Sequence, residues 1–276
     1  VLFMCNFHFG ATAALCAKPS SPFPLITDNL YQTAETLAGY GFDSIEYHIR
    51  DPRREIDGFR LKASADENQL LVSSLGTGMA YGDEGLSITS KDSLTRKAAI
   101  QRLKDHVDLA SILDCYVIIG SMRGKIEDGD TYSQTHQLMK ESMKELADYA
   151  EAKEVTYVIE AIDRFETNYL CTAEQICALI DEIGSSRIGV HLDSYHMNIE
   201  ENNWESPIYI CGNKLKHFHF ADNTRNFPGS GHIPFKALID ALKTIQYKDS
   251  ITLECFPYPD SSTALKNGLA YLKSLL

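Results

Sequence analysis

A single (β/α)8 TIM barrel is the α/β fold that this sequence predicts, and three observations support it. The chain has 276 residues, an ordinary length for one such barrel and a long one for a β-sandwich. Short β-branched or aromatic runs alternate with amphipathic helical stretches, and this rhythm occurs eight times. No glycine-rich phosphate loop follows the first strand, although a doubly wound sheet would commonly carry one. We therefore expect one closed domain over residues 1–276.

The first half of the chain supplies four pairs of strand and helix. The opening run VLFMCNFHFGATAAL is apolar, lacks the basic start of a signal peptide and is typical of a first strand. Pro- and Gly-bearing pieces such as residues 18–24 are too short for domain linkers and serve as single connections. The pairs expected here are strand 2–8 with helix 28–40, 43–48 with 57–66, 70–75 with 92–113, and 116–120 with 132–153.

The second half supplies the other four pairs, and its strands alternate between two faces. On strand 187–193, Ile188, Val190 and Leu192 share the face that packs on the outer helices. This leaves His191 and Asp193 pointing into the barrel. The pairs expected here are 155–160 with 172–183, 187–193 with 203–211, 215–221 with 234–245, and 250–255 with 261–275.

On strand 215–221 the same alternation turns Phe218 and Phe220 outward and His217 and His219 inward. His219 lies nearer the carboxyl end of the strand, where barrels of this type place their catalytic groups. We therefore expect His219 to be a ligand and His217 to support it or to pack. By the same logic His191 belongs to a lower layer and is expected to be hydrogen-bonded structure.

Polar residues stand at the ends of the last four predicted strands. Because the carboxyl ends of parallel barrel strands meet at one face, these side chains should lie together. Three carboxylates and one imidazole suit Mn²⁺, Mg²⁺, Co²⁺ or a similar divalent ion better than a structural zinc. The predicted metal ligands are Glu160, Asp193, His219 and Glu254.

Two of these ligands, Glu160 and Glu254, would flank a bound sugar from opposite sides. A divalent ion that chelates adjacent sugar oxygens stabilises an enediolate, so one glutamate can take a proton and the other can deliver one. Return of the proton on the opposite face is epimerisation, whereas return to the neighbouring carbon is aldose-ketose isomerisation. The pattern predicts an isomerase and leaves both outcomes open.

Composition excludes some partners. The net charge of −12 disfavours nucleic acid and anionic membranes. No run of about eighteen apolar residues is present, so we expect a cytoplasmic protein. Seven cysteines include no CxxC pair and are expected to be reduced.

The second half of the chain resembles the D-tagatose/D-allulose (psicose) 3-epimerase group of the xylose isomerase-like barrel superfamily, also called sugar phosphate isomerase/epimerases. The matching stretches are VIEAIDRFET (158–167), LDSYHMNIEE (192–201), LKHFHFADNTRNFPGSGHIPF (215–235) and LECF (253–256). SLGTGMAYGDEGLSITSKD (74–92) resembles the third-strand loop of the same group.

This resemblance implies a metal-dependent carbohydrate epimerase with one divalent ion, Mn²⁺ preferred and Mg²⁺, Co²⁺ or Zn²⁺ as alternatives. It implies the four metal ligands above, with Glu160 and Glu254 as the acid/base pair. Glu166, His196 and Arg225 resemble the residues that bind the substrate. A homodimer or homotetramer acting on an unphosphorylated sugar is the expected assembly.

Several positions depart from the family pattern and widen the substrate choice. Asp222 stands where a Glu is common, Phe235 where a Trp is common, and the first and fourth strands do not reproduce the usual aromatics. His8 and Arg123, if they lie at the mouth, would select the far end of the substrate. Epimerases of keto-glycosides are therefore an alternative to free ketose 3-epimerases.

Two other classes of protein stay open. An endonuclease IV-like nuclease uses the same type of barrel but needs a larger ligand set and basic loops. A non-catalytic sugar or metal sensor would be expected to have lost one of the paired glutamates, and both are present.

Overall fold

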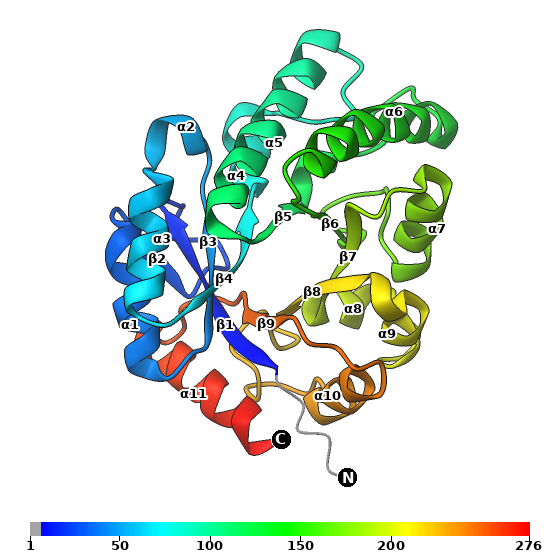
Figure 1. Cartoon of the computed structure of the whole chain (residues 1–276). Coiled ribbons are helices and arrows are strands. Elements are labelled where there is room, and N and C mark those ends of the chain that lie inside the picture. The colour runs from blue at the N-terminus through cyan, green and yellow to red at the C-terminus, as the bar shows by residue number, and fades with distance from the viewer. Residues whose placement is uncertain (1–6) are drawn as a thin grey trace.

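Eight parallel strands close into a barrel in this computed structural model, which describes residues 7–276 (Figure 1). Each strand pairs with its neighbours in chain order, and the first pairs with the last to close the ring. A short strand, β2 (Leu25–Thr27), adds to the outside of β1. The barrel strands are β1 (His8–Leu15), β3 (Ser44–His48), β4 (Leu71–Gly76), β5 (Tyr116–Ile119), β6 (Tyr157–Glu160), β7 (Ile188–Asp193), β8 (Leu215–Phe220) and β9 (Ser250–Leu253).

Helices surround the barrel and connect successive strands (Figure 1). Two of the longer ones begin at a capping box, in which Thr131 or Thr172 and the glutamine three residues later satisfy free backbone N–H groups. The main helices are α1 (Thr33–Tyr40), α3 (Gly58–Glu67), α5 (Ser93–Leu113), α6 (Tyr132–Glu151), α7 (Ala173–Ile183), α9 (Ser206–Cys211), α10 (Phe235–Thr244) and α11 (Ser261–Ser274). Further helical segments are α2 (Pro52–Glu55), α4 (Gly78–Glu84), α8 (Ser194–Glu200), η1 (Leu30–Gln32), η2 (Ser121–Arg123) and η3 (Gly212–Lys214).

The predicted barrel is confirmed, but the predicted first strand is wrong. The strand was expected at 2–8, of which residues 2–6 lie outside the described residues, and the structure begins β1 at His8. A Cβ at Gly10 would lie 2.5 Å from Ser44 Oγ, so β1 needs a very small residue where it meets β3. The aromatic run indicated a strand by its β propensity, whereas the small residues after it fit the crowded barrel interior.

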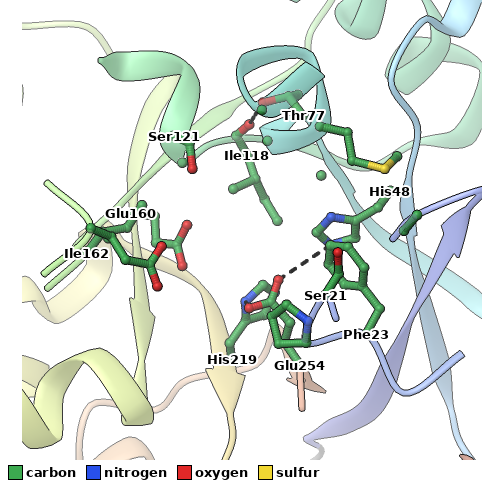
Figure 2. Close-up of a pocket in the computed structure, with 18 of the residues that line it drawn as sticks. Ser21, Phe23, His48, Thr77, Ile118, Ser121, Glu160, Ile162, His219 and Glu254 are labelled. Atoms are coloured by element: carbon green, nitrogen blue, oxygen red, sulfur yellow. Dashed lines mark hydrogen bonds and ion pairs between the residues drawn. The ribbon is translucent and has the colours of Figure 1, made fainter. Parts of the chain in front are cut away.

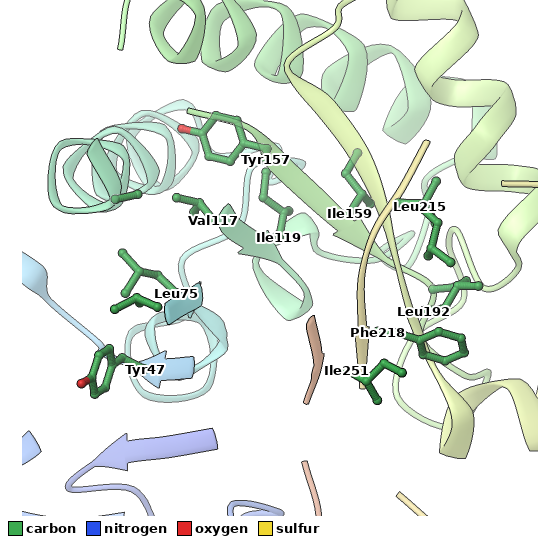
Figure 3. Packing of buried hydrophobic residues seen from close by; sticks show 14 of the residues in the cluster. Tyr47, Leu75, Val117, Ile119, Tyr157, Ile159, Leu192, Leu215, Phe218 and Ile251 are labelled. Carbon is green, nitrogen blue, oxygen red and sulfur yellow. The ribbon is translucent and has the colours of Figure 1, made fainter. Parts of the chain in front are cut away.

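Apolar side chains fill the space between the strands and the helices (Figure 3). Phe220 of β8 packs against Phe235 of α10 with ring centroids 5.1 Å apart. Tyr157 of β6 reaches α5, where its hydroxyl donates to the Leu103 carbonyl. The predicted outward position of Phe220 is thus confirmed.

The barrel interior, by contrast, is polar. Its buried hydroxyl, carboxylate and imidazole side chains include Thr12, Ser44, Glu46, Ser74, His191, His217 and Thr252. Within residues 7–276, no helix combines the length and apolar character that crossing a membrane requires.

Candidate metal centre and active site

The four predicted metal ligands meet at the carboxyl end of the barrel. Glu160, Asp193, His219 and Glu254 are buried, and each offers one ligand atom within 4.8 Å of the others. His219 Nδ1 lies 3.5 Å from Glu254 Oε2 and 4.0 Å from Asp193 Oδ2. Asp193 and His219 are paired residues of neighbouring strands, so the β7–β8 register itself brings them together.

Two atoms of this cluster are suited to a cation. Asp193 Oδ2 and His219 Nδ1 are buried and, among the described residues, have no hydrogen-bond partner. Burying such groups without a partner is costly, and a divalent ion between them would satisfy both. Three carboxylates and an imidazole also match the predicted preference for a hard or borderline ion. The residues present therefore fit one divalent cation.

The carboxylate of Asp193 has a second role in the local fold. Asp193 Oδ1 accepts a hydrogen bond of 2.7 Å from the backbone N–H of Tyr195 and so caps helix α8. The other oxygen, Oδ2, faces Glu254 and His219. The same side chain thus caps helix α8 and contributes an oxygen to the candidate metal site.

The two glutamates differ in their electrostatic surroundings. Burial raises the pKa of Glu160 to about 7, with the charges of Glu254 and Asp193 adding to the rise and His196 opposing it. Burial would also raise the pKa of Glu254, but His219 and Arg225 outweigh it and hold that pKa well below its usual range. Without a cation, Glu254 is therefore ionised at neutral pH while Glu160 is partly protonated.

Arg225 connects two of the predicted site residues. Its Nη1 donates to Glu166 Oε1 at 2.9 Å and its Nη2 donates to Glu254 Oε2 at 2.8 Å. The guanidinium lies over the ring of Tyr195, 4.8 Å from the centroid. The structure thus brings Glu166 and Arg225 to the acid/base candidate Glu254.

His196 of α8 lies beside the other glutamate. Its Nδ1 is 2.7 Å from Asp163 Oδ2, which fixes the ring, and its Nε2 is 3.7 Å from Glu160 Oε1. Burial would lower the pKa of His196, but the hydrogen bond to Asp163 and the charge of Asp193 outweigh it and raise that pKa.

A cavity of about 280 Å³ opens above the cluster, a size suited to a small molecule. Figure 2 shows Glu160 entering it from one side and His219 and Glu254 from another. Of the predicted site residues, Glu160, Glu166, His196, His219, Arg225 and Glu254 line this cavity.

A family model described as Xylose isomerase-like TIM barrel matches residues 34–275. The chain belongs to this family. A ketose 3-epimerase from Arthrobacter globiformis is 30% identical over 221 residues, which cover 78% of this chain and 74% of that protein. An L-ribulose 3-epimerase from Methylomonas sp. (strain DH-1) is 31% identical over 240 residues, covering 85% and 81%.

A solved structure of a related epimerase has the same fold as this chain. A structure of L-ribulose 3-epimerase superposes with a TM-score of 0.84 at 26% identity, covering 98% of this chain and 95% of that one. The predicted resemblance to ketose 3-epimerases is confirmed, and the chain is an isomerase of the epimerase type.

Two residues that would select the substrate if they lay at the mouth of this xylose isomerase-like barrel lie elsewhere. His8 begins β1, at the end of the barrel opposite the metal cluster, and lines a different cavity with Ser73 and Asp249. Arg123 is fully buried and donates to the backbone carbonyl of Glu160 without lining the active cavity. Neither residue therefore meets the condition of lying at the mouth, because β1 begins rather than ends at His8 and the Arg123 side chain is buried away from the cavity.

Asp222, a departure from the family pattern, has a structural role, whereas His191 lacks the hydrogen bonds expected of it. Asp222 accepts hydrogen bonds from the backbone N–H groups of Gly229, Gly231 and Ile233, so it folds the loop that carries Arg225. His191 is buried as predicted, but neither ring nitrogen has a hydrogen-bond partner among the described residues, so the expected bonding was wrong.

Sequence reasoning missed Glu46 and His48, both on β3. His48 lines the active cavity, with its Nε2 3.8 Å from Glu254 Oε1. Glu46 Oε1 and Oε2 each lie 3.0 Å from His219 Nε2. The alternation in SIEYH, which places Ser44, Glu46 and His48 on one face, was the signal that could have identified them.

Proposed function

We propose that this chain is a divalent-metal-dependent ketose 3-epimerase in which Glu160 and Glu254 exchange a proton with an unphosphorylated sugar. The observation that carries the proposal is the placement of two glutamates at one cation-sized cluster, on different sides of a small cavity (Figure 2). Glu160, Asp193, His219 and Glu254 would hold one ion, for which Mn²⁺ is the first choice.

When bound, the ion would act as a Lewis acid that polarises adjacent carbonyl and hydroxyl oxygens of the sugar and so acidifies the neighbouring C–H bond. One glutamate takes the proton from that carbon, and the other returns a proton to the opposite face. In the metal-free protein, Glu254 is ionised and Glu160 is partly protonated near neutral pH. A cation held by both would favour their ionised forms, so the glutamate that returns a proton must first take one up from the sugar hydroxyls or from water.

Arg225, Glu166 and His196 are assigned to the substrate. The Arg225 guanidinium adds positive potential beside Glu254, where negative charge grows on the sugar oxygens during proton removal. Glu166 can accept from a sugar hydroxyl, and His196 can contact an oxygen near Glu160. Together these side chains hold the sugar between the two glutamates.

The proposal also covers the partners, the assembly, the location and the substrate range of the enzyme. The chain's net charge of −12 disfavours polyanionic partners and agrees with a small sugar as the substrate. A homodimer or homotetramer and a cytoplasmic location are expected for this enzyme. Keto-glycosides and aldoses belong in the substrate tests, because the same proton chemistry would serve them.

Deuterium exchange tests the proposal. The Mn²⁺-loaded protein is incubated in D₂O with a panel of ketoses, aldoses and keto-glycosides, the ion is removed, and NMR identifies the carbon that gained deuterium. Exchange at C3 of a ketose is the expected result. Glu160→Gln and Glu254→Gln should each abolish exchange, while Glu145→Gln, a change at a half-exposed site on α6, should not. Full exchange in either active-site variant would show that the acid/base assignment is wrong.

A further inference from the structure

Glu46 occupies the centre of the barrel directly beneath the metal cluster. Its side chain is fully buried, and three histidines and one serine surround its two oxygens. Glu46 Oε1 lies 2.5 Å from His48 Nε2, and Oε2 lies 2.6 Å from His217 Nε2. Four side-chain groups that can donate hydrogen bonds thus converge on its two oxygens, so Glu46 is placed to accept hydrogen bonds as a carboxylate.

The contact with His219 fixes how that ring is used. His219 Nε2 lies 3.0 Å from both Glu46 oxygens, so Nε2 must carry a proton to make this contact favourable. The other nitrogen, Nδ1, then presents its lone pair to Asp193 and Glu254, which lie 4.0 Å and 3.5 Å away. A carboxylate on the far nitrogen of a metal-binding histidine sets the tautomer, holds the ring and makes the ligand more basic.

Glu46 also reaches the substrate side of the cavity through His48. The His48 ring contacts Phe23 on one side, with centroids 4.3 Å apart, and the backbone of Gly76 on another. A Cβ at Gly76 would lie 2.3 Å from the ring, so the close approach requires glycine at this position. His48 therefore has a defined place beside Glu254, and Glu46 is the hydrogen-bonding partner that holds it there.

We infer that Glu46 is the positioning residue of this active site: it orients His219 toward the bound cation and His48 toward the substrate cavity. The inference rests on the proposed function, because it assigns His219 to a cation. Glu46 itself touches neither the cation nor the sugar. Its loss should weaken Mn²⁺ binding by about 10–100-fold, the usual effect of removing such an outer carboxylate.

The wild-type protein provides the first test. Histidine is labelled with ¹⁵N, the protein is loaded with diamagnetic Zn²⁺, and the His219 signals are assigned by comparison with a His219→Asn variant. A proton on Nε2 and none on Nδ1 is the expected result. A proton on Nδ1 would overturn the inference, and this measurement does not depend on whether a Glu46 variant folds.

The second test measures Mn²⁺ affinity by calorimetry in the wild type, Glu46→Gln and Asp105→Asn. Asp105 is a nearly buried carboxylate of α5 that accepts one hydrogen bond from Gln101 and pairs with Arg53 away from the site, so Asp105→Asn is a matched loss of charge. Glu46→Gln should bind Mn²⁺ about 10–100-fold more weakly, and Asp105→Asn should bind it like the wild type.

Three results of this titration would overturn the inference. Equal affinity of Glu46→Gln and wild type would remove the positioning role. Two Mn²⁺ ions per wild-type chain, with one in Glu46→Gln, would make Glu46 a ligand instead, because Glu46, His48 and Glu254 also lie within 4.8 Å of one another. Absence of Mn²⁺ binding by the wild type would refute the proposed function itself. The first two results, by contrast, would refute only the role of Glu46.

Discussion

Replacement of Asp193 by asparagine should separate two roles that its carboxylate combines. Oδ1 caps helix α8 by accepting from Tyr195, whereas Oδ2 has no hydrogen-bond partner among the described residues and lies 4.0 Å from His219 Nδ1 and 3.9 Å from Arg225 Nη2. Asparagine keeps an acceptor oxygen for the cap but places an NH₂ group, which cannot bind a cation, at the other position. Asp193→Ala removes both groups and serves as the comparison.

The expected magnitudes differ for the two roles. Loss of an N-cap costs about 1 kcal/mol, which corresponds to a fall of about 2–4 °C in Tm for a chain of this size. Asp193→Asn keeps this cap and also removes one of the negative charges that add to the effect of burial in raising the pKa of Glu160. Its metal-free Tm should therefore be at least that of the wild type, and Asp193→Ala should melt about 2–4 °C below Asp193→Asn.

Mn²⁺ affinity should depend on the other oxygen of Asp193, Oδ2. Both variants should bind Mn²⁺ at least about 100-fold more weakly than the wild type, since changes to outer-shell groups alone cost about 10–100-fold. Scanning fluorimetry of the metal-free proteins and calorimetry with Mn²⁺ measure the two effects separately. Wild-type Mn²⁺ affinity in Asp193→Asn, or identical Tm values for the two variants, would refute the division of roles between the oxygens.

Three further predictions address the charge, the substrate and the packing of the site. Mn²⁺ affinity should fall by up to about tenfold per pH unit below pH 7, because the pKa of Glu160 is about 7 and the cation needs the ionised carboxylate. Calorimetry between pH 7 and 5.5 measures this effect, and a constant affinity over that range would contradict it. Arg225→Ala should lower kcat about 100-fold with Mn²⁺ still bound, and steady-state kinetics with unchanged turnover would argue against its role beside Glu254. Gly76→Ala should destabilise the fold by about 1–3 kcal/mol in urea unfolding, because the new methyl group collides with the His48 ring; wild-type stability would show that the ring moves freely.

The barrel was predictable because its eight units repeat a pattern that is local in sequence. Outward residues such as Phe220 alternate with inward ones such as His219, and the strand period alone assigns the faces. The first strand was not predictable in this way, since the small inward residues of β1 satisfy a packing limit set by Ser44 and Thr252 of its neighbours. A shift of that one strand moved His8 from the predicted mouth to the opposite end of the barrel.

The candidate ligands were predictable for a related reason. A polar residue at the end of an apolar strand is visible in sequence, and barrel topology gathers such residues on one face. Glu46 lies within a strand, and its inferred role depends on its contacts with His217 and His219, which are more than 170 residues away in the chain. Sequence alone shows that Glu46 points inward but does not show which side chains it meets.

The proposed metal ligands and the proposed substrate-binding residues are held in place differently, and this difference bears on substrate specificity. Glu160, Asp193 and His219 lie on paired strands, so the barrel register sets their spacing. Arg225 lies on a loop fixed from both sides: its N–H donates to the Asp222 carbonyl, and its own carbonyl accepts from the N–H of Phe256.

Part of the cavity wall is formed by the segments 17–23 and 76–83, which are mostly loop or short helix. Changes in those two segments can reshape the proposed sugar site without moving a strand, since neither segment carries a proposed metal ligand. We therefore expect substitutions there to alter which sugar is accepted while Mn²⁺ affinity stays constant, whereas substitutions at the strand ends should alter Mn²⁺ affinity first. This separation follows from the barrel architecture, in which strands provide rigid positions and loops provide variable ones.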